Sequence, residues 1–228
     1  MRFVSASNPL TIGATRRRAT LSLLAAAVMA LSPTVWAATS DEAVVDLQQA
    51  WELINYRTPA AEREKKFEAL ADRAHKVSEA FAGKPEPMVW EGIILSSWAG
   101  EKGGLGALSL VKQAKALYET AIRIDGNALD GSAYNSLGVL YYKVPGWPLG
   151  FGDKAKAREM LQKALAINPN GIDPNYFYAD FLVQTEEPQK AVAHLEKALQ
   201  APARAGRAVA DEGRRTEVRQ LLDKVKGK

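Results

Sequence analysis

The chain has 228 residues, with 30 lysine and arginine side chains against 26 aspartate and glutamate side chains and a formal net charge of +4. The sequence contains no cysteine, which excludes disulfide bonds, thiol catalysis, zinc–thiolate sites and a lipid-anchored cysteine. Hydrophobic residues make up 47% of the sequence, enough for a core that holds the fold without covalent links.

Residues 1–37 have the pattern of a secretory signal peptide. Arg16–Arg18 form a basic segment, an apolar run broken only by a serine extends over 21–31, and a cleavage site follows Ala37. The run is shorter than the roughly 20 residues of a transmembrane helix, which favours cleavage over a membrane anchor. The adjacent arginines also fit twin-arginine export, so both export routes stay open. We expect a mature protein that begins at Ala38 and is located in a bacterial periplasm, with the cell exterior as the alternative.

Removal of residues 1–37 leaves 191 of the 228 residues and changes the charge balance. The removed segment contains four arginines and no other charged residue, so 26 basic and 26 acidic side chains remain. A net charge near zero offers no electrostatic attraction to nucleic acid. We therefore expect no nucleic-acid partner, and no stable membrane insertion after cleavage.

Residues 38–87 predict a pair of amphipathic helices, over 43–56 and 61–81. Apolar residues recur at spacings of three and four in both segments. The two stripes consist of Leu47, Ala50, Trp51 and Ile54, and of Phe67, Leu70, Ala74 and Val77. Pro85 and Pro87 mark the junction with the next segment.

Residues 88–202 carry a helix-pair pattern three times. The clearest copy begins with the spacing aromatic-x-x-Leu-Gly-x-x-Tyr, and its second helix carries an Ala-x-x-x-large-x-x-Ala triplet that recurs 34 residues later. The first-helix residues are Tyr134, Leu137, Gly138 and Tyr141, with Gly92 and Ala179 at the glycine position of the other copies. The triplets are Ala114, Tyr118 and Ala121; Ala157, Leu161 and Ala164; and Ala191, Leu195 and Ala198.

This spacing resembles the tetratricopeptide repeat, a pair of antiparallel helices of about 34 residues. The resemblance implies an all-α solenoid, because one pair cannot bury its apolar face without stacking on others. Residues 38–87 would form a degenerate first repeat. Residues 203–228 would form a loop, non-helical in part over 203–210, and a polar capping helix over 211–226.

Two insertions, at 100–105 and 143–153, are expected to lengthen turns within helix pairs at one edge of the solenoid. The second is rich in glycine and proline yet contains Trp147 and Phe151. Contact with a partner and a plug that folds back on its own helices both explain these aromatic residues.

The concave face is the other candidate site, because the first helix of each pair lines it. Residues one position off the packing stripe are expected to face this groove: Asn135, Val139, Tyr142, Tyr176 and Asp180. A basic patch is formed by Arg204, Arg207, Arg214 and Arg215, for which a solvated cap is favoured over an anion site. Solvent exposure is expected for His75 and His194, and helix capping or a solvated face for Asp173, Asp180, Glu186 and Glu187.

The segment from Asp130 to Leu165 resembles a narrower family, the T component associated with tripartite ATP-independent periplasmic (TRAP) transporters. The resemblance is carried by Gly131, Leu137-Gly138, Leu140-Tyr141, Pro145, Gly152-Asp153-Lys154, Ala157 and Lys163-Ala164-Leu165. It implies an all-helical periplasmic protein, able to self-associate, that assists a substrate-binding protein in solute uptake.

These features predict an exported periplasmic binding or scaffold protein with a protein partner, such as a periplasmic substrate-binding protein or a second copy of the chain. The alternative is a small-ligand carrier with a pocket closed by the 143–153 loop. The sequence has no nucleophile elbow, histidine metal motif or phosphate-binding loop. We therefore expect no catalytic activity, no cofactor and no metal site.

Overall fold

The computed structural model describes residues 39–227. The chain divides into two units, 1–36 and 37–228, and only the second is considered below. The predicted signal peptide and its cleavage site after Ala37 lie outside the described residues.

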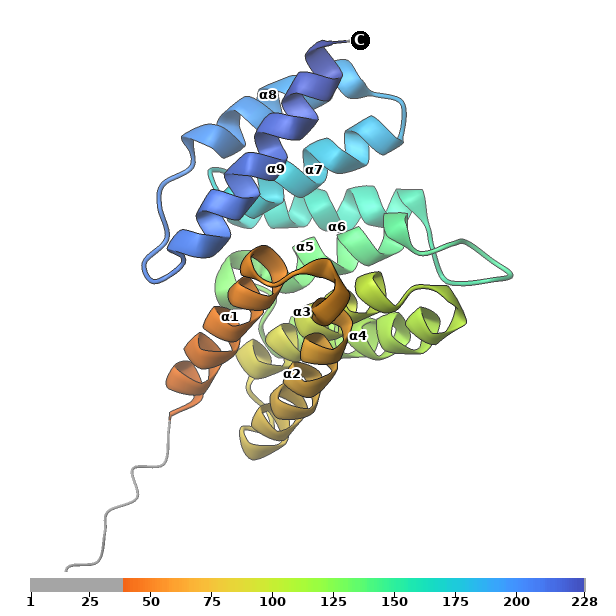
Figure 1. Cartoon of the computed structure of the whole chain (residues 1–228). Helices are drawn as coiled ribbons and strands as arrows, with labels where there is room; N and C mark the ends of the chain where they lie inside the picture. The colour runs from red at the N-terminus through yellow and green to blue at the C-terminus, as the bar shows by residue number, and fades with distance from the viewer. Residues whose placement is uncertain (1–38, 228) are drawn as a thin grey trace, which may run out of the picture. The chain divides into compact units, whose positions relative to one another are not determined.

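Residues 39–227 form nine α-helices and no strand (Figure 1). The helices are α1 (Ser40–Arg57), α2 (Ala60–Ala80), α3 (Pro85–Lys102), α4 (Gly104–Asp125), α5 (Ala128–Lys143), α6 (Lys154–Ile167), α7 (Ile172–Gln184), α8 (Pro188–Gln200) and α9 (Ala208–Lys226). This order confirms the predicted all-α fold, because consecutive helices pack against each other as pairs, α3 with α4, α5 with α6 and α7 with α8.

The predicted packing residues lie between the helices of each pair. All nine members of the three triplets are buried. A Cβ atom added to Gly138 would lie 2.7 Å from Cγ of Leu161, and one added to Gly92 would lie 2.5 Å from Cε1 of Tyr118. The small first-helix residue therefore allows the close approach that the repeat requires.

The odd-numbered helices form an inner layer, in which α1, α3, α5, α7 and α9 contact one another in sequence. Within the described chain, the even-numbered helices contact only odd-numbered ones, so the stack curves with the odd-numbered helices inside. Helix α9 also contacts α1, which brings the two ends of the described chain together. Helix α9 is therefore more than a polar cap, since it closes the inner layer.

The insertion at 100–105 does not lengthen its turn as the sequence predicted. Helix α3 continues to Lys102 and α4 begins at Gly104, so the turn is one residue long. Gly103 and Gly104 have φ values of 64° and 59°, and this left-handed backbone, which glycine adopts freely, reverses the chain at once. The additional residues lengthen the two helices instead. The 144–153 segment, in contrast, is the predicted long loop between α5 and α6.

Candidate functional site

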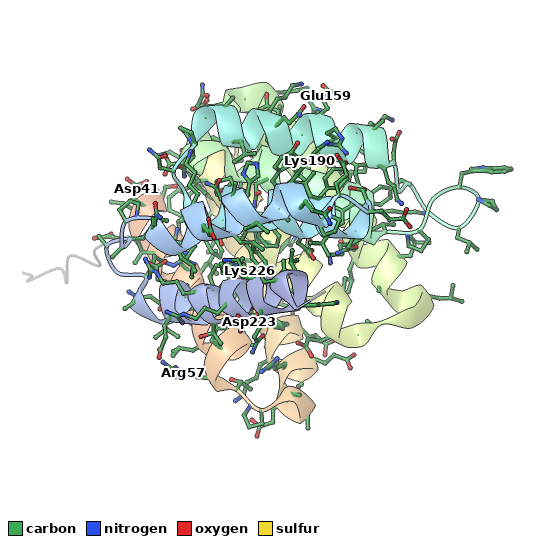
Figure 2. The ribbon with its side chains drawn as sticks, turned by 90° about the horizontal axis from the view of Figure 1, so that it is seen from above. Asp41, Arg57, Glu159, Lys190, Asp223 and Lys226 are labelled. Carbon is green, nitrogen blue, oxygen red and sulfur yellow. The ribbon has the colours of Figure 1, made fainter. Side chains whose placement is uncertain are left out.

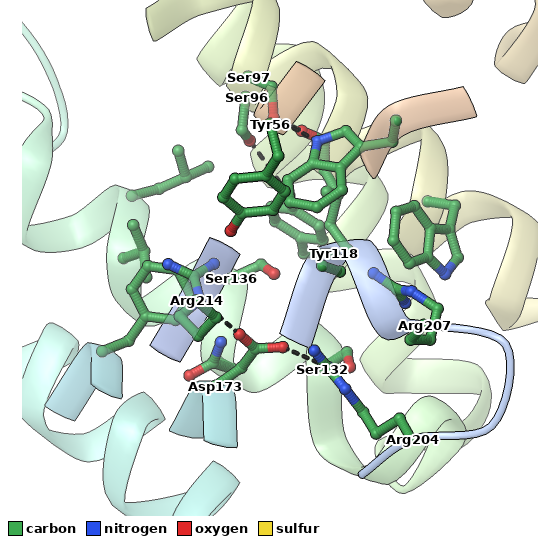
Figure 3. Close-up of a pocket in the computed structure, with 18 residues that line it drawn as sticks. Tyr56, Ser96, Ser97, Tyr118, Ser132, Ser136, Asp173, Arg204, Arg207 and Arg214 are labelled. Atoms are coloured by element: carbon green, nitrogen blue, oxygen red, sulfur yellow. Dashed lines mark hydrogen bonds and ion pairs between the residues drawn. The ribbon is translucent and has the colours of Figure 1, made fainter. Parts of the chain in front are cut away.

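The inner layer lines a cavity of about 260 Å³, which lies between α1, α3, α5, α7, the segment that leads into α9, and the first turns of α9 itself (Figure 3). Its apolar wall includes Trp51 of α1, Trp90 and Ile93 of α3, Val139 of α5 and Phe177 of α7. The polar lining is formed by Tyr56, Ser96, Ser97, Tyr118, Ser132, Asn135, Ser136, Asp173, Arg204, Arg207 and Arg214. We refer to this space as the inner cavity.

Hydrogen bonds between side chains order one wall of the inner cavity. Nε1 of Trp51 donates to Oγ of Ser97 at 2.8 Å, which ties α1 to α3. The hydroxyl groups of Ser96 and Tyr118 lie 3.1 Å apart, and Tyr118 itself is fully buried. Burial raises the pKa of Tyr118, so its hydroxyl remains protonated and is a neutral part of the wall.

The opposite wall is ionic and centres on Asp173, in the first turn of α7. Its carboxylate accepts from Nη1 of Arg204 at 2.6 Å and from Nε of Arg214 at 2.8 Å (Figure 3). Burial alone would raise the pKa of Asp173, but Arg214 and Arg204 outweigh burial and lower it to about 2. The expectation that Asp173 only caps a helix on a solvated face is therefore wrong.

The prediction that the arginine patch is solvated is also wrong, because α9 folds back on α1 and α7. Arg214 is buried, and Arg204, Arg207 and Arg215 are partly buried. Arg204 also pairs with Asp211 at 2.7 Å, and Arg214 with Glu217. The guanidinium carbon of Arg214 lies 4.4 Å from the ring centre of Phe177. The inner cavity therefore receives three arginines that sequence reasoning placed in solvent.

Arg207 differs from the other two arginines of the inner cavity in how it is paired. Its side chain is only 12% exposed, and its guanidinium carbon lies 5.1 Å from the ring centre of Trp90. Its one side-chain hydrogen bond in the described chain runs from Nε to Glu52, at a long 3.4 Å. The Nη1 and Nη2 donors of this partly buried arginine consequently have no acceptor in the described chain.

The predicted groove residues fall into two groups. Asn135 and Val139 line the inner cavity. Tyr142 instead donates to Asp180 at 2.8 Å, which joins α5 to α7, and the ring centre of Tyr176 lies 4.6 Å from the guanidinium carbon of Arg214 in α9. Burial would raise the pKa of Asp180, but Lys143, 2.8 Å away, and neighbouring hydrogen bonds lower it.

The two aromatic residues of the α5–α6 loop have different environments. Trp147 is 90% exposed and the neighbouring Leu149 is 71% exposed, on a loop that protrudes from the helices (Figure 2). Phe151 packs edge-on against Tyr141 at 6.0 Å between ring centres. The inner cavity is lined by other segments, so the loop does not close it as the carrier alternative supposed.

The two histidines and Glu187 differ in how far they are exposed. His75 is exposed as expected, but His194 is partly buried, with Nδ1 3.1 Å from Oδ1 of Asn175, and burial lowers its pKa. Glu187, expected in solvent, pairs with Arg158 and Lys190. In residues 39–227 no group of three or more histidine or acidic side chains is arranged to hold a metal ion. Within the same residues, no helix has the length and apolar character needed to cross a membrane.

Residues 149–211 match the family model for the tetratricopeptide repeat, a segment that extends over α6, α7 and α8. No curated protein matches the sequence. The match and the stacked helix pairs together support a tetratricopeptide-repeat protein. Such repeats typically mediate binding to a protein partner, and proteins built from them are generally scaffolds rather than enzymes.

Proposed function

We propose that this chain is an exported periplasmic scaffold that binds a protein partner through the α5–α6 loop. The observation that carries the proposal is the exposure of Trp147 and Leu149 at the tip of this loop. Exposed apolar side chains are costly in water and often mark contact surfaces, and tryptophan is enriched among the residues that dominate interfaces. The loop sits on a repeat scaffold of a class that typically binds proteins.

The same edge of the molecule carries a further exposed apolar residue. Leu105, at the start of α4, is 90% exposed. The α3–α4 turn and the α5–α6 loop lie on the same side in Figure 1. A partner that covers this edge would bury Leu105 together with Trp147 and Leu149.

Periplasmic export is part of the proposal. Within the described residues the first helix begins at Ser40, shortly after the predicted cleavage site at Ala37, and its cap is made by residues that would follow cleavage. Thr39 and Glu42 form a capping box, with hydrogen bonds of 2.8 and 3.2 Å. A folded protein would therefore begin close to the new N-terminus. N-terminal mass spectrometry of the exported protein should find Ala38, and an intact Met1 in the membrane fraction would contradict export with cleavage.

The finer proposal is that the partner is a substrate-binding protein of a TRAP-type uptake system. Two of the residues on which the resemblance to the TRAP T component rests stabilise the α5–α6 hairpin. Gly138 allows the approach of Leu161, and Oδ1 of Asp153 accepts from the backbone N–H groups of Ala155 and Lys156 at 2.9 and 3.1 Å. The loop that carries Trp147 is thus held between two helices that pack closely, and its end at Asp153 is capped.

Site-specific photo-cross-linking in the native host tests the partner. A photoreactive phenylalanine replaces Trp147 in one variant and Ile124 in the control, since Ile124 is 45% exposed at the other end of α4. We expect residue 147 alone to yield an adduct with a periplasmic substrate-binding protein, identified by mass spectrometry. Adducts that contain only a second copy of the chain, or equal adducts from both positions, would refute the proposal.

A further inference from the structure

We propose that the inner cavity binds a small organic carboxylate, with Arg207 as the carboxylate-binding residue. The proposal concerns a site separate from the α5–α6 loop and does not depend on the proposed scaffold function. Three features carry it: the available Arg207 donors, two further polar groups without partners, and a wall of aromatic side chains.

Arg207 has the geometry of an anion receptor. Its stem is at the start of α9, and Figure 3 shows the side chain entering the inner cavity. Stacking on Trp90 and the Nε contact with Glu52 orient the guanidinium, while Nη1 and Nη2 have no acceptor in the described chain. A guanidinium fixed in this way offers parallel N–H donors, the arrangement that matches the two oxygens of a carboxylate.

Asn135 supplies the second observation. It is only 6% exposed and lines the inner cavity, yet its Oδ1 atom is buried with no hydrogen-bond partner in the described chain. A buried amide oxygen left unpaired is destabilising, and it can only accept, so its place on the cavity wall fits a ligand that carries a hydroxyl or amide N–H donor in addition to its carboxylate.

Tyr56 adds a third polar group. Its ring packs edge-on against Trp51 at 5.8 Å between centres, and its hydroxyl has no hydrogen bond in the described chain. In Figure 3 this hydroxyl points to the side of the inner cavity where Arg214 and Ser136 lie. Burial raises the pKa of Tyr56 to about 12, which keeps the hydroxyl protonated and able to donate.

The charges of the wall disfavour a multiply charged anion. Asp173, Asp211 and Glu217 neutralise Arg204 and Arg214, and Glu52 lies beside Arg207. The wall therefore has no excess of positive charge. Binding of an anion depends on hydrogen-bond donors aimed at it rather than on the overall electrostatic potential of the cavity. A carboxylate with an apolar body fits these donors and the Trp51, Trp90 and Phe177 wall better than phosphate does.

The experiment compares benzoate, benzamide and inorganic phosphate on the purified protein. Benzamide keeps the ring of benzoate without its charge, and phosphate keeps the charge without the ring. Nuclear magnetic resonance titration follows the indole N–H signals of Trp51 and Trp90. We expect benzoate to shift both signals and to bind about tenfold or more tightly than either other probe, the factor expected for a charge-assisted hydrogen bond. Equal affinity for benzoate and benzamide, equal affinity for phosphate, or no shift with benzoate would overturn the proposal.

Single-residue variants test whether Arg207 binds the carboxylate. Arg207→Gln should weaken benzoate about tenfold and leave benzamide unchanged. Arg219→Gln, which removes the same charge from an exposed position of α9, should change neither. Tyr56→Phe removes a hydroxyl without a partner in the fold, so it remains informative if Arg207→Gln unfolds, and it should weaken benzoate several-fold. If Arg207→Gln folds and binds benzoate with unchanged affinity, the assignment is refuted. If Arg207→Gln does not fold, unchanged benzoate affinity in Tyr56→Phe refutes it. Trp147→Ala should retain full benzoate binding, which separates this site from the scaffold surface.

Discussion

Replacement of Gly138 with alanine tests the contact on which the repeat depends. The added Cβ atom would lie 2.7 Å from Cγ, 3.0 Å from Cδ2 and 3.2 Å from the backbone nitrogen of Leu161. Leu161 is fully buried, so its side chain has little room to turn away. Contact with the backbone nitrogen means that α6 itself must shift from α5.

The free-energy cost of this overpacking can be separated from the gain in helix stability by replacing a second helical glycine that has no close neighbours. Overpacking of this kind costs about 1–3 kcal/mol, whereas alanine gains roughly 0.5–1 kcal/mol over glycine inside a helix. Gly100 of α3 has no atom within 4 Å of its added Cβ, so Gly100→Ala shows the helix gain alone. We expect the free energies of unfolding of the two variants to differ by about 1–3 kcal/mol, with Gly138→Ala the less stable.

Urea denaturation followed by circular dichroism measures both variants against the parent protein. The midpoint should fall for Gly138→Ala and rise slightly for Gly100→Ala, at unchanged slope. If Gly138→Ala proves as stable as Gly100→Ala, α5 and α6 do not meet at this glycine, and the repeat assignment is wrong for this pair.

Three further predictions follow from burial and charge. Leu137→Ala should lower the free energy of unfolding by about 2–5 kcal/mol in the same assay, because Leu137 is buried, and an unchanged midpoint would contradict its place in the core. Phe151→Ala should lower the midpoint, because Phe151 packs against Tyr141. Trp147→Ala should change stability by less than about 0.5 kcal/mol and abolish capture of the partner in a pull-down, and the reverse pattern would make Trp147 structural. The depressed pKa of Asp173, about 2 against 3.8, stabilises the fold above about pH 4 by roughly 2 kcal/mol, and this contribution is lost as pH falls towards 2. Asp173→Asn should therefore be less stable at pH 7 and show a weaker loss of stability over that range; an unchanged acid profile would refute the role of the ion pairs.

The helix pairs were predictable because the repeat is encoded in local spacing. Gly138 meets Leu161 and Gly92 meets Tyr118, and each of these contacts joins the two helices of one pair. The buried or exposed state of these residues follows from helical periodicity alone.

The inner cavity was not predictable in this way, because its walls come from distant parts of the chain. Arg207 meets Glu52 across 155 residues, and Arg214 meets Asp173 across 41. Spacing within α9 shows closely placed arginines but gives no sign of the acids that pair with them. The only signal in the sequence was the dense cluster of arginines in a segment expected to cap the stack. Three of these arginines line the inner cavity.

Closure of the inner layer explains why two separate surfaces are proposed. In an open solenoid the concave groove is wide enough for a polypeptide partner. Here α9 contacts α1, and the inner cavity of about 260 Å³ has a size suited to a small molecule. The proposed protein partner is therefore assigned to another surface of the described chain, the edge where Trp147 and Leu149 expose large apolar side chains. If a ligand in the inner cavity favours the closed contact of α9 with α1, it would act on the scaffold only through the stacked helices, since the loop does not reach the cavity.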